Sequence, residues 1–371
     1  MTLTAAALRA AFDAPEPLTV GVEEELMLLH PETLDLAPRA PAVLDALGGD
    51  PRVKLELPAS QLEIVTDAAR HAGEIGEQLG ASRRRLAEAA EGIARPAAAG
   101  LHPFAEPAGE LNPGERYDHT RRLYGPVAPR QLVCALQVHV AVGGAERTLA
   151  VHNALRSQLP ELAALAANAP FYEGYDTGMA SARPKVAELL PRQGVPPVMP
   201  SWEAFADALA WGAAAGVMET PASWWWELRP NPAFGTLEVR VPDAQTTVAE
   251  AAAVVAVVHA LVARLAERHD AGDLPPPAPS WRIEENRWAA CHRGVDGQLA
   301  DLTTGERVPA RERLRALLAE LEPVAEHQGA GAELARAGGL VEAGGAAAQR
   351  AAAREGGTAA VARHLAESFL A

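Results

Sequence analysis

Cysteine and lysine are nearly missing from this 371-residue sequence. Its only cysteines, Cys134 and Cys291, cannot form a disulfide framework or a paired-cysteine metal site. Its only lysines are Lys54 and Lys185, and neither follows a glycine-rich turn, which excludes a Walker-A phosphate loop. No GxGxxG motif follows a predicted strand either. Any bound ATP must therefore be held in another way.

Signal-peptide and membrane features are also lacking. The first residues have neither a charged nor an apolar segment of the kind that directs secretion. We see no apolar run that approaches the ~20 residues of a membrane span. A soluble cytoplasmic protein without a membrane partner is therefore expected.

Positive charge is in the minority, with 33 basic against 48 acidic residues and a net charge of −15. This balance argues against a nucleic-acid surface, although it permits nucleotides that carry Mg²⁺. The hydrophobic fraction of 49% is enough for a sizeable core. We expect one catalytic domain over residues 1–371, with a core at about 18–305 and an Ala-rich helical segment at 306–371.

Three consecutive glutamates lie inside an apolar run at residues 20–28 that is typical of a β-strand. Side chains alternate along a strand, so Glu23 and Glu25 share one face, about 7 Å apart at Cα. Glu24 lies on the other face with Val22 and Leu26, where it would pair with an arginine or reach solvent. Because two neighbouring carboxylates in a strand are costly, we infer that a cation lies between them. We also expect Glu24→Gln to be tolerated better than Glu23→Gln.

Three further segments share this construction, with one apolar face and one face that carries acid, His, Gln or Arg. They are residues 61–65, 132–142 and 235–241. The polar faces would bring together Glu23, Glu25, Glu63, Gln137, His139, Glu238 and Arg240. Cys134 lies on an apolar face, so a catalytic role for it is not expected.

Helical patterns alternate with these strands, so we predict an α+β layer with a sheet open to a polar cleft on one face. The expected helices cover residues 73–95, 147–168, 202–217, 247–269, where Thr247 and Glu250 form a capping box, and most of 309–371. Further short strands are expected at 55–57, 101–105, 224–230 and within 281–305. The Ser82–Arg85 run is interpreted as a solvated helix face. Residues 112–129 are either a helix with exposed arginines or a segment that faces substrate.

Four carboxylates and one imidazole suit Mg²⁺ or Mn²⁺ better than a closed zinc site. So many acids suggest more than one ion, and paired ions can clamp phosphate oxygens during transfer. Arg240 would then neutralise charge on the transferred phosphoryl group. The alternative is a set of amphipathic strands with incidental exposed acids, in which His139 has only a structural role.

The chain resembles the YbdK-type carboxylate–amine ligases, also called the glutamate–cysteine ligase type 2 family. The motifs that carry the resemblance appear in family order: GVEEE (21–25), LPASQLEIVT (57–66), GLHPFA (100–105), LVCALQVHVAV (132–142), VHNALR (151–156), the loop that ends in Ser-Ala-Arg (181–183) and RPNPAFGTLEVRVPDAQTTVAEA (229–251). They cover roughly residues 18–265.

The resemblance implies a glutamine-synthetase-like fold, in which an antiparallel sheet forms a funnel-shaped cleft and helices pack outside. It implies metal ligands at Glu23, Glu25, Glu63, His139 and Glu238. It further implies a phosphate contact from Arg240. Gln137, on the polar face beside His139, is a second candidate for cofactor binding. Arg183, at the end of the Ser-x-Arg loop, is a candidate partner for a substrate carboxylate.

The implied activity is ATP-dependent ligation of the γ-carboxylate of glutamate to the amine of cysteine, through an acyl phosphate. Two alternatives remain: the same chemistry on another amine or acid, and a non-catalytic nucleotide- or metal-binding relative. A metal-dependent hydrolase is less favoured, because no separate nucleophile–base pair stands out. The expected partners are small molecules, and tryptophans such as those at 224–226 would be compatible with a homodimer.

Overall fold

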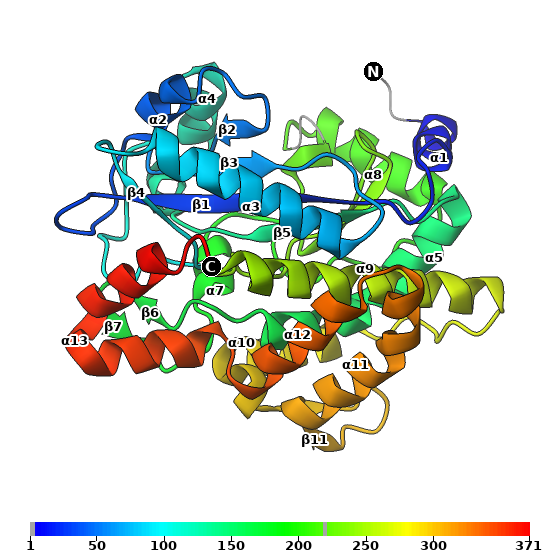
Figure 1. The fold of residues 1–371 in the computed structure, drawn as a ribbon. Coiled ribbons are helices and arrows are strands. Elements are labelled where there is room, and N and C mark those ends of the chain that lie inside the picture. The colour runs from blue at the N-terminus through cyan, green and yellow to red at the C-terminus, as the bar shows by residue number, and fades with distance from the viewer. Residues whose placement is uncertain (1–3, 218–220) are drawn as a thin grey trace.

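A seven-stranded antiparallel sheet forms the centre of the computed structural model, which describes residues 4–217 and 221–371 (Figure 1). Its strands follow the order β2-β3-β1-β5-β9-β8, and β4 pairs with β1 beside this path. The strands are β1 (Val20–Leu29), β2 (Val53–Leu55), β3 (Gln61–Val65), β4 (Arg95–Ala97), β5 (Leu136–Val140), β8 (Leu228–Asn231) and β9 (Thr236–Val239). Two small sheets pair β6 (Phe171–Tyr172) with β7 (Tyr175–Asp176), and β10 (Gln298–Ala300) with β11 (Arg307–Pro309).

The longest strand, β1, organises the sheet because it pairs with β3, β4 and β5. Its alternation is as predicted: Val20 and Val22 lie on the packed face, whereas Glu23 and Glu25 lie on the other. Residues directly opposite each other in an antiparallel pair share a face. Glu25 lies opposite Glu63, and His139 lies opposite both Gly21 and Glu238. The register therefore gathers the polar side chains of four strands on one face.

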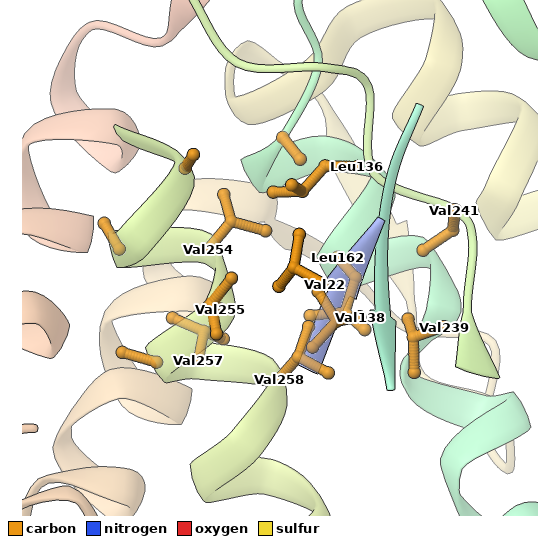
Figure 2. Packing of buried hydrophobic residues seen from close by; sticks show 14 of the residues in the cluster. Val22, Leu136, Val138, Leu162, Val239, Val241, Val254, Val255, Val257 and Val258 are labelled. Atoms are coloured by element: carbon orange, nitrogen blue, oxygen red, sulfur yellow. The ribbon is translucent and has the colours of Figure 1, made fainter. Parts of the chain in front are cut away.

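Helices cover the apolar face. The α-helices are α1 (Ala5–Asp13), α2 (Ala40–Ala46), α3 (Ala72–Ala89), α4 (Glu115–Tyr124), α5 (Ala145–Leu155), α6 (Leu159–Leu165), α7 (Arg183–Ala187), α8 (Trp202–Ala214), α9 (Val248–Asp270), α10 (Ser280–Arg293), α11 (Ala310–His327), α12 (Gly331–Glu342) and α13 (Gly345–Glu367). Valines of α9 lie against Val22 and Val138 of the sheet and belong to the same core cluster as Val239 (Figure 2). The predicted α+β fold, with an antiparallel sheet and helices on its outer face, is confirmed.

Helix α9 is apolar on all sides because it is covered on all sides. The sheet, α3 and α5 pack against one side of it, and α11 and α12 pack against the other. It begins at the predicted capping box, in which Thr247 and Glu250 satisfy each other's backbone N–H groups. By length and composition α9 could cross a membrane, contrary to our expectation that no run approaches that length, but 78% of its most apolar window is buried inside the molecule.

An ion pair lies in the core between the sheet and α3. The carboxylate of Glu24 accepts hydrogen bonds from Nε and Nη2 of Arg83, at 2.9 and 2.6 Å, and both side chains are fully buried. The same guanidinium donates to the carbonyls of Gln245, Thr246 and Phe369, and its plane lies over the Phe369 ring. Glu24 thus pairs with an arginine, as one of our two expectations had it.

The prediction of a solvated face at Ser82–Arg85 is wrong for Ser82 and Arg83, although Arg84 and Arg85 are exposed. Periodicity alone cannot show that a distant strand offers Arg83 a buried carboxylate. Burial of this pair also removes the reason to expect that Glu24→Gln is harmless, because the substitution would leave Arg83 without its counter-charge in the core.

The other differences between predicted and observed elements lie near turns, where the hydrophobic periodicity is interrupted. Residues 101–105 form only one isolated bridge, at Leu101, and the edge strand β4 falls where the end of a helix was expected. The expected strand at 55–57 is instead β2, which ends at Leu55. The largest error is at residues 281–293, which were predicted to contain short strands and belong to helix α10, whereas β10 does lie within the predicted segment 281–305. The C-terminal segment is helical as predicted, and its Leu340 and Phe369 belong to the main hydrophobic core.

Replacing Arg83 with methionine should leave Glu24 as an unpaired charge in the core. We expect the free energy of unfolding to fall by about 3–5 kcal/mol, measured by urea denaturation. Arg84→Met, at the exposed neighbouring position, is the matched control and should change stability by no more than about 0.5 kcal/mol. Equal losses in the two variants would show that the buried pair does not stabilise the fold.

Candidate active site

Two clusters of potential metal ligands lie on the polar face of the sheet. The first cluster is Glu23, His139 and Glu238; the second cluster is Glu25, Glu56 and Glu63. Within each, one ligand atom per residue lies within 4.8 Å of the others. All five predicted metal ligands are thus present, but they are divided between two groups. Glu56 completes the second group and was not predicted.

The histidine of the first cluster is oriented for a ligand. Nδ1 of His139 lies 3.0 Å from Oγ1 of Thr236. Its buried Nε2 has no hydrogen-bond partner among the described residues, and lies 3.8 Å from Glu23 and 4.0 Å from Glu238. Metal-binding histidines usually hold one ring nitrogen by a hydrogen bond and offer the other to the ion. A divalent cation would satisfy this nitrogen and both carboxylates.

The carboxylates of the first cluster stay ionised. Burial raises the pKa of Glu23, but the nearby imidazole of His139, 3.8 Å away, outweighs it and leaves the pKa below its usual value. Glu238 is fully buried, and burial also works against its charge; the charges of Arg240 and Arg229, helped by His139, hold its pKa far below the ordinary range. This cluster is therefore already charged for a cation at neutral pH.

In the second cluster the surroundings raise the pKa values of the carboxyl groups, whereas in the first cluster they lower them. Burial, helped by the charge of Glu56, raises the pKa of Glu25 to about 7. Burial likewise raises the pKa of Glu56, and burial with three neighbouring carboxylates raises that of Glu63 well above normal. The nearest ammonium group, that of the half-exposed Lys54, is 3.8 Å from Glu63. Three acids in this setting resist ionisation until a cation joins them, which is the behaviour of a hard-metal site.

Gln137 and Arg240 connect the two clusters. The amide of Gln137 donates from Nε2 to Glu25, at 2.7 Å, and its oxygen accepts a hydrogen bond from Arg240. Arg240 also donates to Glu238. One guanidinium nitrogen therefore contacts a residue of the first cluster directly and one of the second through a single amide. This is where the phosphate-contacting arginine was expected.

Glu238 is held by further groups that the sequence analysis did not assign to the site. Arg229 donates to both of its carboxylate oxygens, at 2.8 and 3.0 Å, and Asn231 donates to one, at 2.9 Å. Arg229 lies in β8, which begins at Leu228, whereas Glu227 precedes the strand and pairs with Arg287. The signal that could have identified Arg229 is its place opposite Glu238 across the β8–β9 hairpin.

Glu56 escaped prediction because it follows the end of β2, where alternation no longer applies. Its sequence signal was weak but present: an acid between two leucines, Leu55 and Leu57, just before a proline. That surrounding resembles the apolar flanks of the glutamates in β1.

A cavity of about 170 Å³ opens beside the second cluster. Its wall combines Glu25 and Glu56 with four arginines and with apolar side chains such as Leu190 and Trp225. The arginines are Arg116, Arg183, Arg240 and Arg287. The interpretation of residues 112–129 as a helix with exposed arginines is confirmed over α4, whose Arg116 and Tyr117 line the cavity; that this segment faces substrate stays a prediction.

Arg183 lies at the cavity wall, but most of its guanidinium is already engaged. Nε donates to Asp243 at 2.6 Å, and Nη2 donates to the carbonyls of Val241 and Arg240, at 2.6 and 3.3 Å. The residue therefore braces the segment that follows β9 and carries Arg240. No partner for its Nη1 occurs in the described parts of the chain, so that nitrogen is the donor left for a substrate.

A second pocket, of about 230 Å³ and mostly apolar, opens beside the first cluster. Glu23 and His139 form part of its wall, and β1 supplies Val20, Gly21 and Val22. The two ligand clusters thus lie between a cavity rich in arginine and a pocket rich in apolar surface.

Comparison with known sequences gives close matches. Residues 19–366 match the family described as Glutamate-cysteine ligase family 2 (GCS2). A relative from Rubrobacter xylanophilus, provisionally named glutamate–cysteine ligase 2-3, is 39% identical over 371 residues, which cover 97% of this chain and 99% of the relative. Another from Thermobifida fusca, provisionally named glutamate–cysteine ligase 2, is 34% identical over 331 residues, 87% of this chain and 83% of the relative.

Solved structures with the same fold have diverged far in sequence. A glutamate–cysteine ligase from Francisella tularensis, crystallised in complex with AMP, superposes with a TM-score of 0.70 at 13% identity and covers 95% of this chain and 89% of that one. A bifunctional glutathione synthetase from Pasteurella multocida gives a TM-score of 0.60 at 14% identity, covering 98% of this chain and 53% of that one.

Metal binding at the second cluster should depend on pH. Because the pKa of Glu25 is about 7 rather than 4.5, its carboxyl is protonated below neutrality and must lose a proton to bind an ion. We expect Mn²⁺ affinity to fall from pH 8 to pH 6, and binding at pH 6 to release protons. Calorimetry in buffers of different ionisation enthalpy measures both quantities.

The raised pKa of Glu25 also determines how this residue makes the stability of the metal-free protein depend on pH. In the native state Glu25 keeps its proton between about pH 4.5 and 7, where it would be ionised in the unfolded state, so its own contribution to stability should fall as pH rises through this window. The free energy of unfolding of the wild type relative to Glu25→Gln, which cannot titrate, should therefore fall over this window in the metal-free protein, and Mn²⁺ should reverse this fall. Identical Mn²⁺ affinity at pH 6 and 8 without proton release would contradict the assignment.

Proposed function

The chain belongs to glutamate–cysteine ligase family 2, and from this membership we propose that it is an ATP-dependent carboxylate–amine ligase. The proposed reaction joins the γ-carboxylate of glutamate to the amine of cysteine, in the cytoplasm, through an acyl phosphate. The observation that carries the proposal is the pair of ligand clusters on one sheet face, linked by Gln137 and Arg240 and flanked by two different pockets.

The six cluster residues fit Mg²⁺ or Mn²⁺. Hard divalent cations prefer carboxylate oxygens and accept an imidazole, and the orphaned Nε2 of His139 supplies an unused ligand. When bound, such ions neutralise phosphate charge and orient the phosphates for in-line transfer. The side chains of Glu23, His139 and Glu238 would hold one ion, and those of Glu25, Glu56 and Glu63 another.

In the proposed first step, a carboxylate oxygen of glutamate attacks the γ-phosphorus of ATP and ADP leaves with the electrons of the broken bond. In the second step, the amine attacks the acyl carbon, the bond from that carbon to the phosphate oxygen breaks, and inorganic phosphate leaves with the electrons of this bond and takes up the proton that the amine loses. Arg240 lies between the clusters, where negative charge would develop on the transferred group, and a fixed guanidinium there stabilises that charge.

The arginine-lined cavity suits an anionic amino acid. Arg116 is exposed at its wall, and Nη1 of Arg183 is available to a carboxylate. Arg287 is less available because Glu227 and Glu188 already accept its hydrogen bonds. We assign glutamate to this cavity, with Arg116 and Arg183 as candidates for its carboxylates. The apolar part of the wall, including Trp225, is compatible with cysteine or with another amine.

ADP release in the presence of glutamate, cysteine and Mg²⁺ tests the proposal. Glu23→Gln should lower kcat by on the order of 100-fold or more, because it removes a ligand whose charge acts on the reacting phosphates. Glu322→Gln, on the exposed surface of α11, is the matched control and should keep wild-type activity. Thermal unfolding of both variants verifies that the fold is intact.

The assay separates the alternatives. ADP release that requires glutamate but accepts other amines would change the second substrate and keep the chemistry. No ADP release with any acid and amine, despite nucleotide binding, would favour a non-catalytic relative. Unchanged activity in Glu23→Gln would show that the proposed site is wrong.

A further inference from the structure

An exposed aromatic ring lies at the apolar pocket beside the first cluster. Phe234 lies in the β8–β9 hairpin, lines this pocket and is 55% exposed. The rings of Phe234 and His139 make a T-shaped contact, with their centroids 5.6 Å apart and an angle of 86° between their planes. A large aromatic side chain left this open to solvent, beside an apolar pocket, has surface available for a flat ligand.

The hairpin that carries Phe234 is fixed in place. Both Phe234 and Gly235 donate backbone hydrogen bonds to the carbonyl of Asn231, at 3.3 and 2.9 Å. Gly235 has a φ of 68°, and a Cβ there would lie 2.2 Å from the carbonyl oxygen of Ala11, so only glycine fits. The ring is therefore presented on a tight turn packed against the segment that precedes β1.

The same hairpin is also joined to the ligand cluster. Asn231 donates to Glu238, and Thr236 contacts Nδ1 of His139. A molecule whose phosphates meet a cation at Glu23, His139 and Glu238 would therefore extend its other end past the ring of Phe234. Glu23 and His139 line both the cluster and the pocket, which makes the two continuous.

The polar groups in the pocket wall are mostly occupied. The hydroxyl of Thr19 donates to the carbonyl of Glu16, that of Thr66 accepts from the N–H of Val22, and that of Thr236 faces His139. Recognition in this pocket consequently depends on apolar contact and stacking more than on hydrogen bonds from these side chains.

We propose that Phe234 is a specificity-determining residue that stacks against the base of the nucleoside triphosphate and favours purines over pyrimidines. This inference deepens the proposed function and rests on it for the identity of the nucleotide. Larger rings offer more stacking surface, so a purine gains more from Phe234 than a pyrimidine does. The phosphates, held by the cluster side, contribute equally to both.

Calorimetric titration with non-hydrolysable imido analogues of ATP and CTP, in the presence of Mg²⁺, tests this role without any turnover. Phe234→Ala should raise the Kd of the ATP analogue roughly 10- to 100-fold, the range found when a base-stacking aromatic is removed. It should raise the Kd of the CTP analogue less, so that the preference for purine narrows. Phe234→Trp should retain the wild-type preference.

Two controls separate stacking from damage to the fold. Trp211→Ala removes another aromatic, 68% exposed on α8 and outside the pocket, and should leave both Kd values unchanged. Mn²⁺ binding without nucleotide should be the same in Phe234→Ala and in the wild type. Loss of Mn²⁺ binding in Phe234→Ala would overturn the stacking role and would show instead that the Phe234 ring holds His139 in position for the ion.

The outcomes also distinguish this inference from the proposed reaction. Wild-type affinity for the ATP analogue in Phe234→Ala overturns the inference and leaves the ligase proposal standing. Nucleotide binding that depends on Phe234 without ligation of glutamate to an amine supports the inference and defeats the proposed reaction. If the wild type bound neither analogue, both would be overturned.

Discussion

The buried pair of Glu24 and Arg83 determines whether β1 can present its other two glutamates. Glu24 is the residue between Glu23 and Glu25, so its position fixes which way both neighbours face. Arg83 ties this point of the strand to α3 and to the carbonyls of Gln245 and Thr246. A salt bridge with no solvent access is not strongly stabilising by itself, but a one-residue slip of β1 would bury two unpaired carboxylates. The pair therefore specifies the register of the strand.

With this register, the two clusters on the polar face of the sheet differ in whether their carboxyl groups are ionised. Around Glu238 two arginines keep a buried carboxylate ionised, whereas burial, helped by the charge of Glu56, raises the pKa of Glu25. The two clusters are thus unequal, although both consist of strand residues from the same sheet. One is charged before a cation binds, and the other becomes charged as it binds. The amide of Gln137 joins them without adding charge.

Much of this arrangement follows from strand alternation, and the rest does not. Alternation placed Glu23, Glu25, Glu63, His139 and Glu238 on one face, and the structure agrees. It could not divide them into two groups, because that requires knowing that β3 and β5 flank opposite sides of β1. Glu56 lies beyond a strand end, and its only sequence signal is its place between two leucines. Whether these residues bind metal stays a prediction.

Two errors have a common physical origin. The run from Ser82 to Arg85 looked solvated because three charged side chains rarely enter a core, yet Arg83 has a buried partner 59 positions away in sequence. Residues 281–293 were assigned to short strands because a glycine-containing turn follows them, yet Trp281 and Trp288, seven residues apart, both lie exposed on the single helix α10. In both cases tertiary contacts outweighed the local pattern.

The position of α9 has a consequence for how the chain is made. Ribosomes synthesise proteins from the N-terminus, so α9 emerges before α11 and α12, the helices that cover its outer side. During that interval a 23-residue apolar helix faces water on one side. The nascent chain must be protected by chaperones, or must delay docking of α9 on the sheet, until about 70 further residues have been translated. The last quarter of the chain, which follows α9, thus covers the core that the preceding residues assemble.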